Sequence, residues 1–304
     1  MADFVASGWS VYIAVATVLS LLACLVLLFI AARRKVASGA VDDNTTGHVW
    51  DEDLRELNNP LPRWWMYLFV ITVLFSAAYL ALYPGLGNFA GTLQWSSRGQ
   101  YEAEKAEAAA AMAPLYARFA GMNETALARD SQAMGIGERL FINNCATCHG
   151  SDARGSKGFP NLTDGDWLWG GGFDTIQQTI GKGRSGAMPP MAAAVGSSDD
   201  VRNVAHYVLS LSGSPHDSVA AQLGRSKFSA CAACHGVDGK GNPALGAPNL
   251  SDKVWLHGWG ESAIVAMVNG GKNNVMPAHA QRLSAEQIRV LAAYVWSLSN
   301  TTTP

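Results

Sequence analysis

Two short motifs hold the residues with the most specific chemistry in this chain of 304 residues. CATCHG begins at Cys145 and CAACHG begins at Cys231, so a histidine follows each CxxC pair at once. A disulfide within the pair leaves that histidine unexplained, and zinc sites usually join two CxxC units about 15–20 residues apart. CxxCH is the attachment signature of c-type haem. The motifs therefore predict two covalently bound haem c groups. The predicted tethers are Cys145, Cys148, Cys231 and Cys234, and the predicted proximal iron ligands are His149 and His235.

One methionine follows each motif at a similar distance. Met188 and Met276 lie 39 and 41 residues after their histidines, each after a glycine-rich run and directly before a proline. Methionine opposite histidine raises a haem's reduction potential, which suits an electron carrier. We predict both as axial ligands, and the sequence leaves open which of the two haems each one serves. The alternatives, which lack a like residue in the other copy, are Met191, His206, His257 and His279.

The motifs lie in a tandem duplication, with an offset between 86 and 88 residues. Gly137 matches Gly224, and "PNL" occurs at 160 and again at 248. Each copy closes on an apolar pattern of helical period, beginning at Val201 and at Ile288. The segments between are rich in glycine and proline, with no alternating strand pattern, so an all-α fold is expected. We expect the PNL asparagines, Asn161 and Asn249, to fix turns, and Trp167 and Trp255 to wall the haem or pack in the core.

The first part of the chain contains two long apolar runs. Trp9 to Ala32 has 24 residues without a charge, and Trp64 to Tyr83 has 20. About 20 helical residues cross a hydrocarbon core of about 30 Å, so both runs predict transmembrane helices. Cys24 lies inside the first run and is expected to be a packing residue.

Positive charge follows the first run instead of preceding it. "RRK" at 33–35 comes after the span, which is the reverse of a signal peptide. The positive-inside rule places the following loop in the cytoplasm and both termini on the outer side of the membrane, which is the periplasmic side of the inner membrane in a bacterium. Within the loop, "WDEDLRELNNP" has acids near a possible helix start, so a short interfacial helix is expected. "YPGLG" at 83–87 is expected to stop the second span, and an Ala- and Glu-rich linker helix follows, interrupted at Pro114.

Composition and motifs together divide the chain. Only 15% of residues are charged, which fits membrane segments, and a formal net charge of −2 gives no indication of nucleic-acid binding. The predicted parts are a first span (1–35), a cytoplasmic loop (36–63), a second span (64–87), a linker helix (88–130) and two cytochrome c domains (131–213 and 214–304).

The order of these parts resembles one known family. The haem repeats are similar to tandem class I cytochrome c domains. "HVWDEDLRELNNPLPRWWMYLFVITVLFSAAYLALYPGLG", from His48 to Gly87, resembles the N-terminal signature of the dihaem, membrane-anchored subunit III of cbb-type cytochrome c oxidases. The resemblance implies partner contact by the loop 36–63, and partners in a catalytic haem–copper subunit, a monohaem cytochrome c subunit, a soluble cytochrome c donor and membrane lipid. It also implies that the ligand set above holds the haems.

The main hypothesis is therefore a subunit that transfers electrons toward an oxygen-reducing partner. We expect no oxygen-reducing site on this chain, because its spans contain no cluster of copper or haem ligands. Two other functions are compatible with two haems: the dihaem subunit of a quinone-linked dehydrogenase, and a haem-based redox sensor. Co-purifying subunits would distinguish the first, and carbon monoxide binding to the ferrous protein would support the second.

Overall fold

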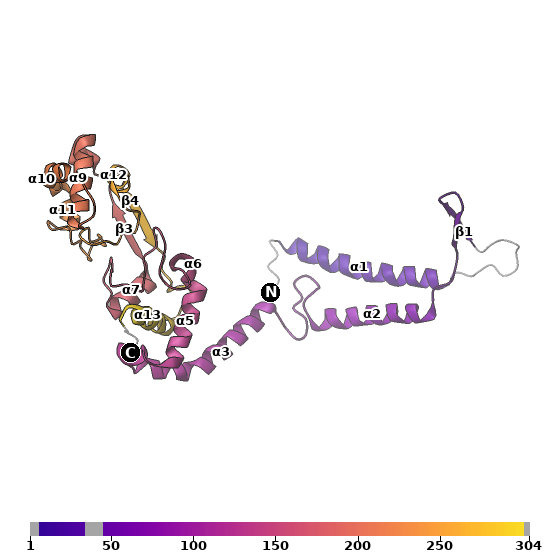
Figure 1. Ribbon diagram of the computed structural model, residues 1–304. Helices are drawn as coiled ribbons and strands as arrows, with labels where there is room; N and C mark the ends of the chain where they lie inside the picture. Colours follow the sequence, from indigo (N-terminus) through magenta and orange to yellow (C-terminus); the bar gives the residue numbers. More distant parts are fainter. Residues whose placement is uncertain (1–5, 34–44, 301–304) are drawn as a thin grey trace. The chain divides into compact units, whose positions relative to one another are not determined.

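The computed structural model describes residues 6–33 and 45–300. The chain divides into two compact units between Met112 and Ala113. The expectation of a mostly helical chain with two apolar helices near its N-terminus is confirmed (Figure 1). Four short strands, paired in two ribbons, are additional to the predicted all-α fold. Their segments have only four to six residues, which is too short to show a clear alternating pattern in the sequence.

The first unit contains the two apolar helices, α1 (Ser7–Ala32) and α2 (Arg63–Leu82). Both are long and apolar enough to cross a membrane, and 6% and 0% of their apolar windows are buried, so neither is a core helix of this chain. α1 and α2 contact one another. The Ser10 hydroxyl accepts a hydrogen bond from the Asn88 N–H at 2.7 Å, which ties the start of α1 to the segment after α2. Cys24 is exposed on α1.

The loop between the two apolar helices forms a hairpin and not the expected short helix. β1 (Thr45–Trp50) pairs antiparallel with β2 (Leu54–Leu57), around a turn in which Asp51 and Glu52 have positive φ. An isolated helix of this length is marginal in water, and pairing with the preceding Thr- and Val-containing segment satisfies the backbone instead. Arg34 and Lys35, on which the membrane orientation partly rests, lie outside the described residues.

The linker forms one helix, α3 (Ser97–Ala120), and Pro114 lies inside it without ending it. The prediction of an interruption was therefore wrong. A proline removes one backbone hydrogen bond, but the alanines on both sides and the glutamates before it have high helix propensity and maintain the helix. The predicted stop at 83–87 is confirmed, because α2 ends at Leu82.

The second unit contains both CxxCH motifs in two groups of elements. Lobe I consists of α5 (Ser131–Asn144), α6 (Ala146–His149), α7 (Phe173–Lys182) and α13 (Ala285–Asn300), with α4 (Glu124–Leu127) against α13. Lobe II consists of α8 (Ala192–Val195), α9 (Ser198–Leu211), α10 (Ser218–Lys227), α11 (Ser229–His235) and α12 (Glu261–Gly270). β3 (Arg184–Met188) leads from lobe I to lobe II, and β4 (Lys272–Met276) leads back.

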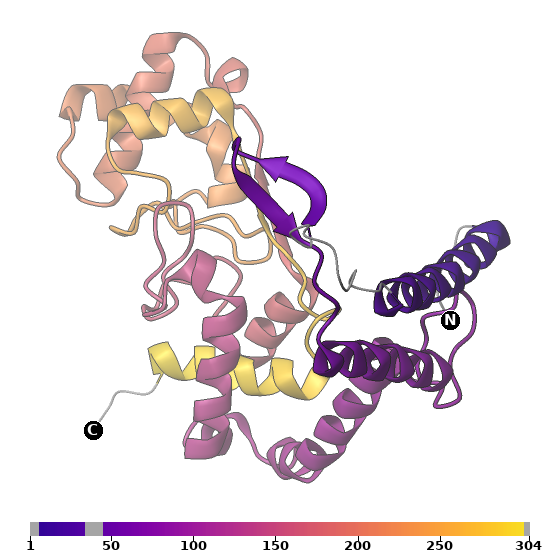
Figure 2. The same cartoon turned by 90° about the vertical axis from the view of Figure 1, so that its right-hand side faces the viewer.

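The two repeats exchange their closing helices. α13, which closes the second repeat, packs against α5 and α7 of the first, and Figure 2 shows it in yellow across the pink α5. α9, which closes the first repeat, packs against α10 of the second. Both crossings use the matched glycines: a Cβ on Gly137 would lie 2.5 Å from Tyr294 Cβ, and one on Gly224 would lie 2.0 Å from the Asn203 carbonyl oxygen. The domain division at 213/214 stays a prediction.

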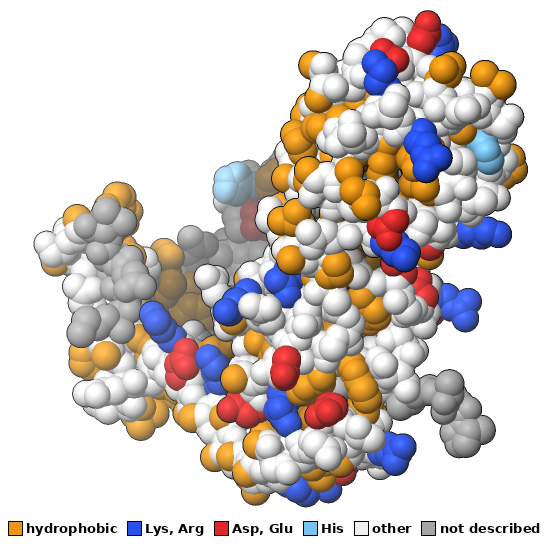
Figure 3. Space-filling view, turned by 90° about the vertical axis from the view of Figure 1, so that its left-hand side faces the viewer, with side chains coloured by type: hydrophobic (Ala, Val, Ile, Leu, Met, Phe, Trp, Pro, Cys, Tyr) orange, Lys and Arg blue, Asp and Glu red, His pale blue; other side chains and the backbone are white. Residues whose placement is uncertain are grey.

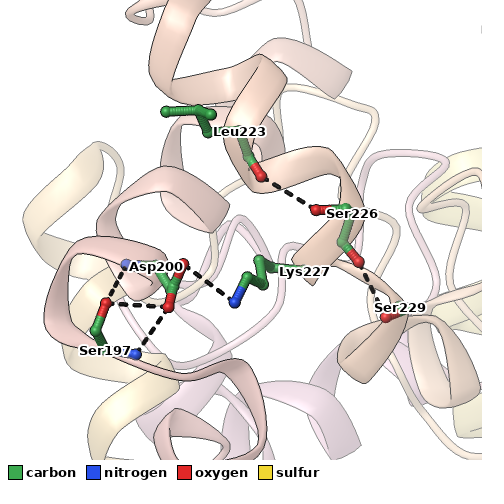
Figure 4. Close-up of polar contacts among 6 residues, drawn as sticks. All are labelled: Ser197, Asp200, Leu223, Ser226, Lys227 and Ser229. Atoms are coloured by element: carbon green, nitrogen blue, oxygen red, sulfur yellow. Dashed lines mark hydrogen bonds and ion pairs between the residues drawn. The ribbon is translucent and has the colours of Figure 1, made fainter.

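Side chains at the start of α9 fix this helix and join it to α10. Ser197 and Asp200 form a capping box in which each accepts a hydrogen bond from the backbone N–H of the other (Figure 4). Asp200 also pairs with Lys227 at the end of α10, with a distance of 3.2 Å between Oδ1 and Nζ. The contact therefore crosses from the first repeat to the second.

Candidate haem-binding sites

Each CxxCH motif forms a helical turn in which the first cysteine is more buried than the second. Cys145 lies between α5 and α6 and is half-buried, while Cys148 is exposed; in α11, Cys231 is buried and Cys234 is exposed. None of the four forms a disulfide. Burial, and next the neighbouring Cys148, raise the pKa of the Cys145 thiol to about 11, and burial also raises the pKa of Cys231.

The two histidines are oriented identically. His149 and His235 are 9% and 8% exposed, and each Nδ1 donates a hydrogen bond to a proline carbonyl: Pro160 at 3.0 Å and Pro248 at 3.1 Å. A hydrogen bond of this kind fixes the ring and the tautomer, so that Nε2 keeps its lone pair for a metal. Burial lowers the pKa of His235, which favours the neutral ring that ligates iron.

The asparagines of the two PNL segments fix turns, as expected. Asn161 Oδ1 accepts hydrogen bonds from the Thr163 N–H at 2.9 Å and hydroxyl at 2.8 Å. Asn249 Oδ1 does the same with Ser251, at 2.9 and 2.7 Å. The turns follow directly on the prolines that bind the histidines, so this local structure supports the orientation of both imidazoles.

The two methionines lie on one ribbon that neither repeat forms alone. β3 and β4 pair antiparallel in the register Arg184↔Met276 through Met188↔Lys272. Met188 packs against the buried core of lobe II, which includes Cys231 and Val204. Met188, from the first repeat, thus lies against the lobe that contains the CxxCH motif of the second repeat.

Met276 lies at the other end of the ribbon, beside α7 of lobe I. Its carbonyl oxygen is 2.4 Å from the position that a Cβ would take on Gly183, whose φ is +72°. Three residues further on, the His279 N–H donates to the Ile180 carbonyl at 3.0 Å, so the chain follows the end of α7. Hollows of about 490 and 230 Å³ open beside Met188 and Met276.

The other predicted residues have varied surroundings. Trp255 packs against the lobe II core, together with Met191, which remains an alternative to Met188. The ring of Trp167 lies against Gly171. His279 is buried, and its Nδ1 has no hydrogen-bond partner among the described residues, so it remains an alternative ligand in lobe I.

Two further histidines are occupied by protein groups. His206 Nδ1 accepts a hydrogen bond from the Asp217 N–H at 3.2 Å, and its Nε2 lies 3.4 Å from Glu261. His257 Nε2 is 2.9 Å from the Asn274 side-chain nitrogen, which donates to it. These contacts weaken both as candidates for iron ligands.

Each lobe therefore contains residues of the types that a six-coordinate haem c needs. Two cysteines lie three positions apart on one helical turn, an imidazole with an available Nε2 follows them, and a methionine lies on the ribbon that joins the lobes. A thiol adds across a haem vinyl group, its hydrogen passing to carbon, so each tether forms without another reagent. The residues present fit two haem c groups.

Comparisons with known proteins agree with this donor set. Residues 132–208 and 220–295 match the family described as cytochrome c oxidase, cbb3-type, subunit III, and residues 42–90 match the N-terminal domain of cytochrome oxidase-cbb3, FixP. The cbb3-type cytochrome c oxidase subunit CcoP of Rubrivivax gelatinosus is 65% identical over 303 residues, which are 100% of this chain and 99% of that protein.

More distant relatives share most of the chain as well. The cbb3-type cytochrome c oxidase subunit FixP of Azorhizobium caulinodans is 40% identical over 278 residues, covering 86% of this chain and 94% of the relative. That of Sinorhizobium medicae is 41% identical over 272 residues, covering 84% and 93%. The duplicated haem motifs, the apolar helices ahead of them and these matches together show that the chain belongs to the family of cbb3-type cytochrome c oxidase subunit III.

Proposed function

We propose that this chain conducts electrons from a soluble cytochrome c toward the oxygen-reducing subunit of a cbb3-type oxidase. When bound, each haem c supplies the reversible one-electron couple of its iron. The protein's residues tether the two groups, hold their axial ligands and keep those ligands partly shielded from water. Family membership supports the assignment to the oxidase, and the geometry of the ribbon supports the relay.

The single observation that carries the relay is the position of both methionines on the same ribbon. Met188 and Met276 belong to the half-buried face of the pair β3–β4, at its opposite ends. The two ends are four residue steps apart along the strand, which is about 13 Å at about 3.3 Å per step. One rigid element therefore sets the separation of the two ligands, and electron transfer between the lobes needs such a short, fixed separation.

We further propose that the repeats exchange axial ligands. Met276 would serve the iron of His149 in lobe I, because the chain after β4 follows α7. Met188 would serve the iron of His235 in lobe II, because its side chain packs on the core that contains Cys231. Neither repeat would then supply a complete haem site.

Chains with a single haem test this exchange. In a Cys145→Ser/Cys148→Ser background only the lobe II site remains, and Met188→Ala should lower the potential of the remaining haem while leaving it attached. Met276→Ala in the same background is the matched control and should leave that potential unchanged. If Met276→Ala lowers it and Met188→Ala does not, each methionine serves its own repeat.

We propose that α1 and α2 both span the bacterial inner membrane, with the loop between them in the cytoplasm and the lobes in the periplasm. The bond between Ser10 and Asn88 supports a common side for the start of α1 and the end of α2. Arg33, Arg55 and Arg63 in the loop support its cytoplasmic location. Alkaline phosphatase fused after Gly91 should be active, and fused after Thr46 inactive; the reverse pattern would contradict this orientation.

The function is tested on the intact complex. Isolated through this subunit, it should contain a haem–copper subunit and a monohaem cytochrome c subunit, with two covalent haems on this chain by pyridine haemochrome. Reduced soluble cytochrome c should reduce it rapidly. On the face drawn in Figure 3, Lys and Arg side chains alternate with Asp and Glu among apolar ones, so the salt dependence should be moderate. Fewer than two haems, or dehydrogenase subunits in place of the haem–copper core, would refute the proposal.

A further inference from the structure

The half-buried face of the ribbon places a cation directly opposite each methionine. Arg184 pairs with Met276, and Lys272 pairs with Met188. Opposed residues of an antiparallel pair point to the same face, with their Cβ atoms about 5 Å apart. Burial alternates along β3 accordingly, since Arg184, Gly186 and Met188 are half-buried and the two residues between them are exposed. Each lobe therefore has one positive side chain next to its methionine.

The cation in lobe I is held firmly by its neighbours. Arg184 Nε donates to the Thr179 hydroxyl at 2.9 Å, and Nη2 donates to Gln178 Oε1 at 3.1 Å; both partners belong to α7. The guanidinium carbon lies 5.0 Å from the centre of the Trp169 ring, within the range of a cation–π contact. An arginine is charged at any physiological pH, so this charge is both fixed and permanent.

Trp169 is itself fixed between the ribbon and the second repeat. A Cβ on Gly186 would lie 3.9 Å from the ring, so this strand position is in van der Waals range of it. Gly246, at φ +65°, approaches the ring so closely that a Cβ there would lie 2.3 Å from it. The aromatic surface under Arg184 therefore depends on a glycine of the second repeat.

The equivalent place in lobe II is built differently. Lys272 takes the position of Arg184 and is exposed, and its ammonium has no hydrogen bond or ion pair among the residues that the structure describes. His257 takes the position of Trp169, and Asn274 that of Gly186. A solvated ammonium on a flexible stem is screened by water and salt, so it exerts a weaker field than a fixed guanidinium.

We propose that Arg184 raises the reduction potential of the haem that Met276 serves, and thereby makes lobe I the site of higher potential. This inference rests on the proposed function. Reduction lowers the positive charge on iron by one, so a fixed cation beside the axial ligand favours the reduced state. Lys272 has the same sign but a smaller effect, and the difference between the two cations separates the potentials.

The test is a spectroelectrochemical titration of the haem-loaded full chain in detergent, with two components resolved. Met276→Ala first identifies the component that belongs to lobe I. Arg184→Gln should lower the equilibrium constant for reduction of the same component about tenfold, which lowers its potential by about 59 mV for a one-electron couple. Arg184→Lys, which keeps the charge, should lower it by less than half as much. Lys272→Gln should shift the other component by less than Arg184→Gln shifts the first.

Three results would overturn the inference: an unchanged potential in Arg184→Gln, a shift in Arg184→Lys as large as in Arg184→Gln, or an equal shift in Lys272→Gln. The second would mean that packing and not charge is responsible. Haem content by pyridine haemochrome is measured on the same samples, and the subunits that co-purify are measured on the complex isolated through each variant. Two haems and an intact oxidase with an unchanged potential would reject the role of Arg184 and leave the proposed function standing.

Discussion

Replacing Leu291 with alanine should loosen lobe I, although Leu291 belongs to the second repeat. It lies on α13, which packs against α5 and α7, and its side chain is 0% exposed. Truncating a fully buried leucine to alanine costs about 2–5 kcal/mol. If the loss falls on the contact between α13 and α5, the open form of α5 becomes about 30-fold to several thousand-fold more populated.

The matched change in the first repeat is Val204→Ala. Val204 corresponds to Leu291 in the repeat alignment, is also 0% exposed, and lies in the core of lobe II with Phe228 and Cys231. Removing its two methyl groups should cost about 1–3 kcal/mol and should loosen α10 in place of α5. The two substitutions therefore test the exchange of closing helices in opposite directions.

Hydrogen exchange read by mass spectrometry on the full haem-loaded chain distinguishes the lobes. Peptides from 131–144 report on α5 and peptides from 218–227 report on α10. In Leu291→Ala, exchange should accelerate in α5 while α10 stays close to wild type, and Val204→Ala should give the reverse. Acceleration of α10 by Leu291→Ala, with α5 protected, would show that each closing helix packs within its own repeat.

Gly224→Ala should lower the melting temperature, because a Cβ at this position would lie 2.0 Å from the Asn203 carbonyl oxygen. This clash costs about 1–3 kcal/mol and outweighs a gain of up to about 1 kcal/mol in helix propensity. Gly270→Ala is the control and should not lower the melting temperature, because a Cβ there has no atom within 4 Å. Hydrogen bonds from the backbone lower the pKa of the Asp217 carboxyl in the folded protein. The carboxylate therefore stabilises the fold above its ordinary pKa, and this stabilisation is lost as the pH falls through the lower pKa of the folded state. Asp217→Asn should make the melting temperature fall less steeply at acid pH, and an unchanged acid dependence would contradict this. Cys234→Ser should reduce covalent haem below two per chain on a denaturing gel, and a full complement would refute the tether.

Local patterns in the sequence were sufficient for the two apolar helices and for the CxxCH turns. A CxxCH turn and a 20-residue apolar helix are both specified by neighbours in the chain, so α2 and the two motifs agree with expectation. The turns at Asn161 and Asn249 are likewise local. Local reasoning was wrong where two tendencies compete. Pro114 disfavours a helix, but strong helix formers on each side of it maintain α3. The acidic loop segment could begin a short helix, but it pairs with the strand before it.

The ribbon and the exchange could not be predicted from periodicity. Residues that pair across β3 and β4, such as Arg184 and Met276, are far apart in the chain, and each strand has only five residues. The apolar faces of α9 and α13 have the same pattern whether each packs on its own opening helix or on the other repeat's. One signal was present: only Ser212 to Asp217 separates α9 from α10, and so short a connection favours adjacent helices.

The exchange also explains why the chain crosses between the lobes twice and why the crossing is a ribbon. Lobe II is continuous in sequence, from the end of β3 to the end of α12, and has its closing helix ahead of its opening helix. Lobe I is made of two pieces, one before and one after that stretch. The chain must therefore leave lobe I and return to it at neighbouring points, and two strands running out and back pair antiparallel. Because each strand ends at the lobe it enters, Met188 arrives in lobe II and Met276 in lobe I. A duplicated chain arranged as two independent domains would need one connection between its lobes and would have no such ribbon. The placement of both candidate axial methionines on one element therefore follows from the exchange itself.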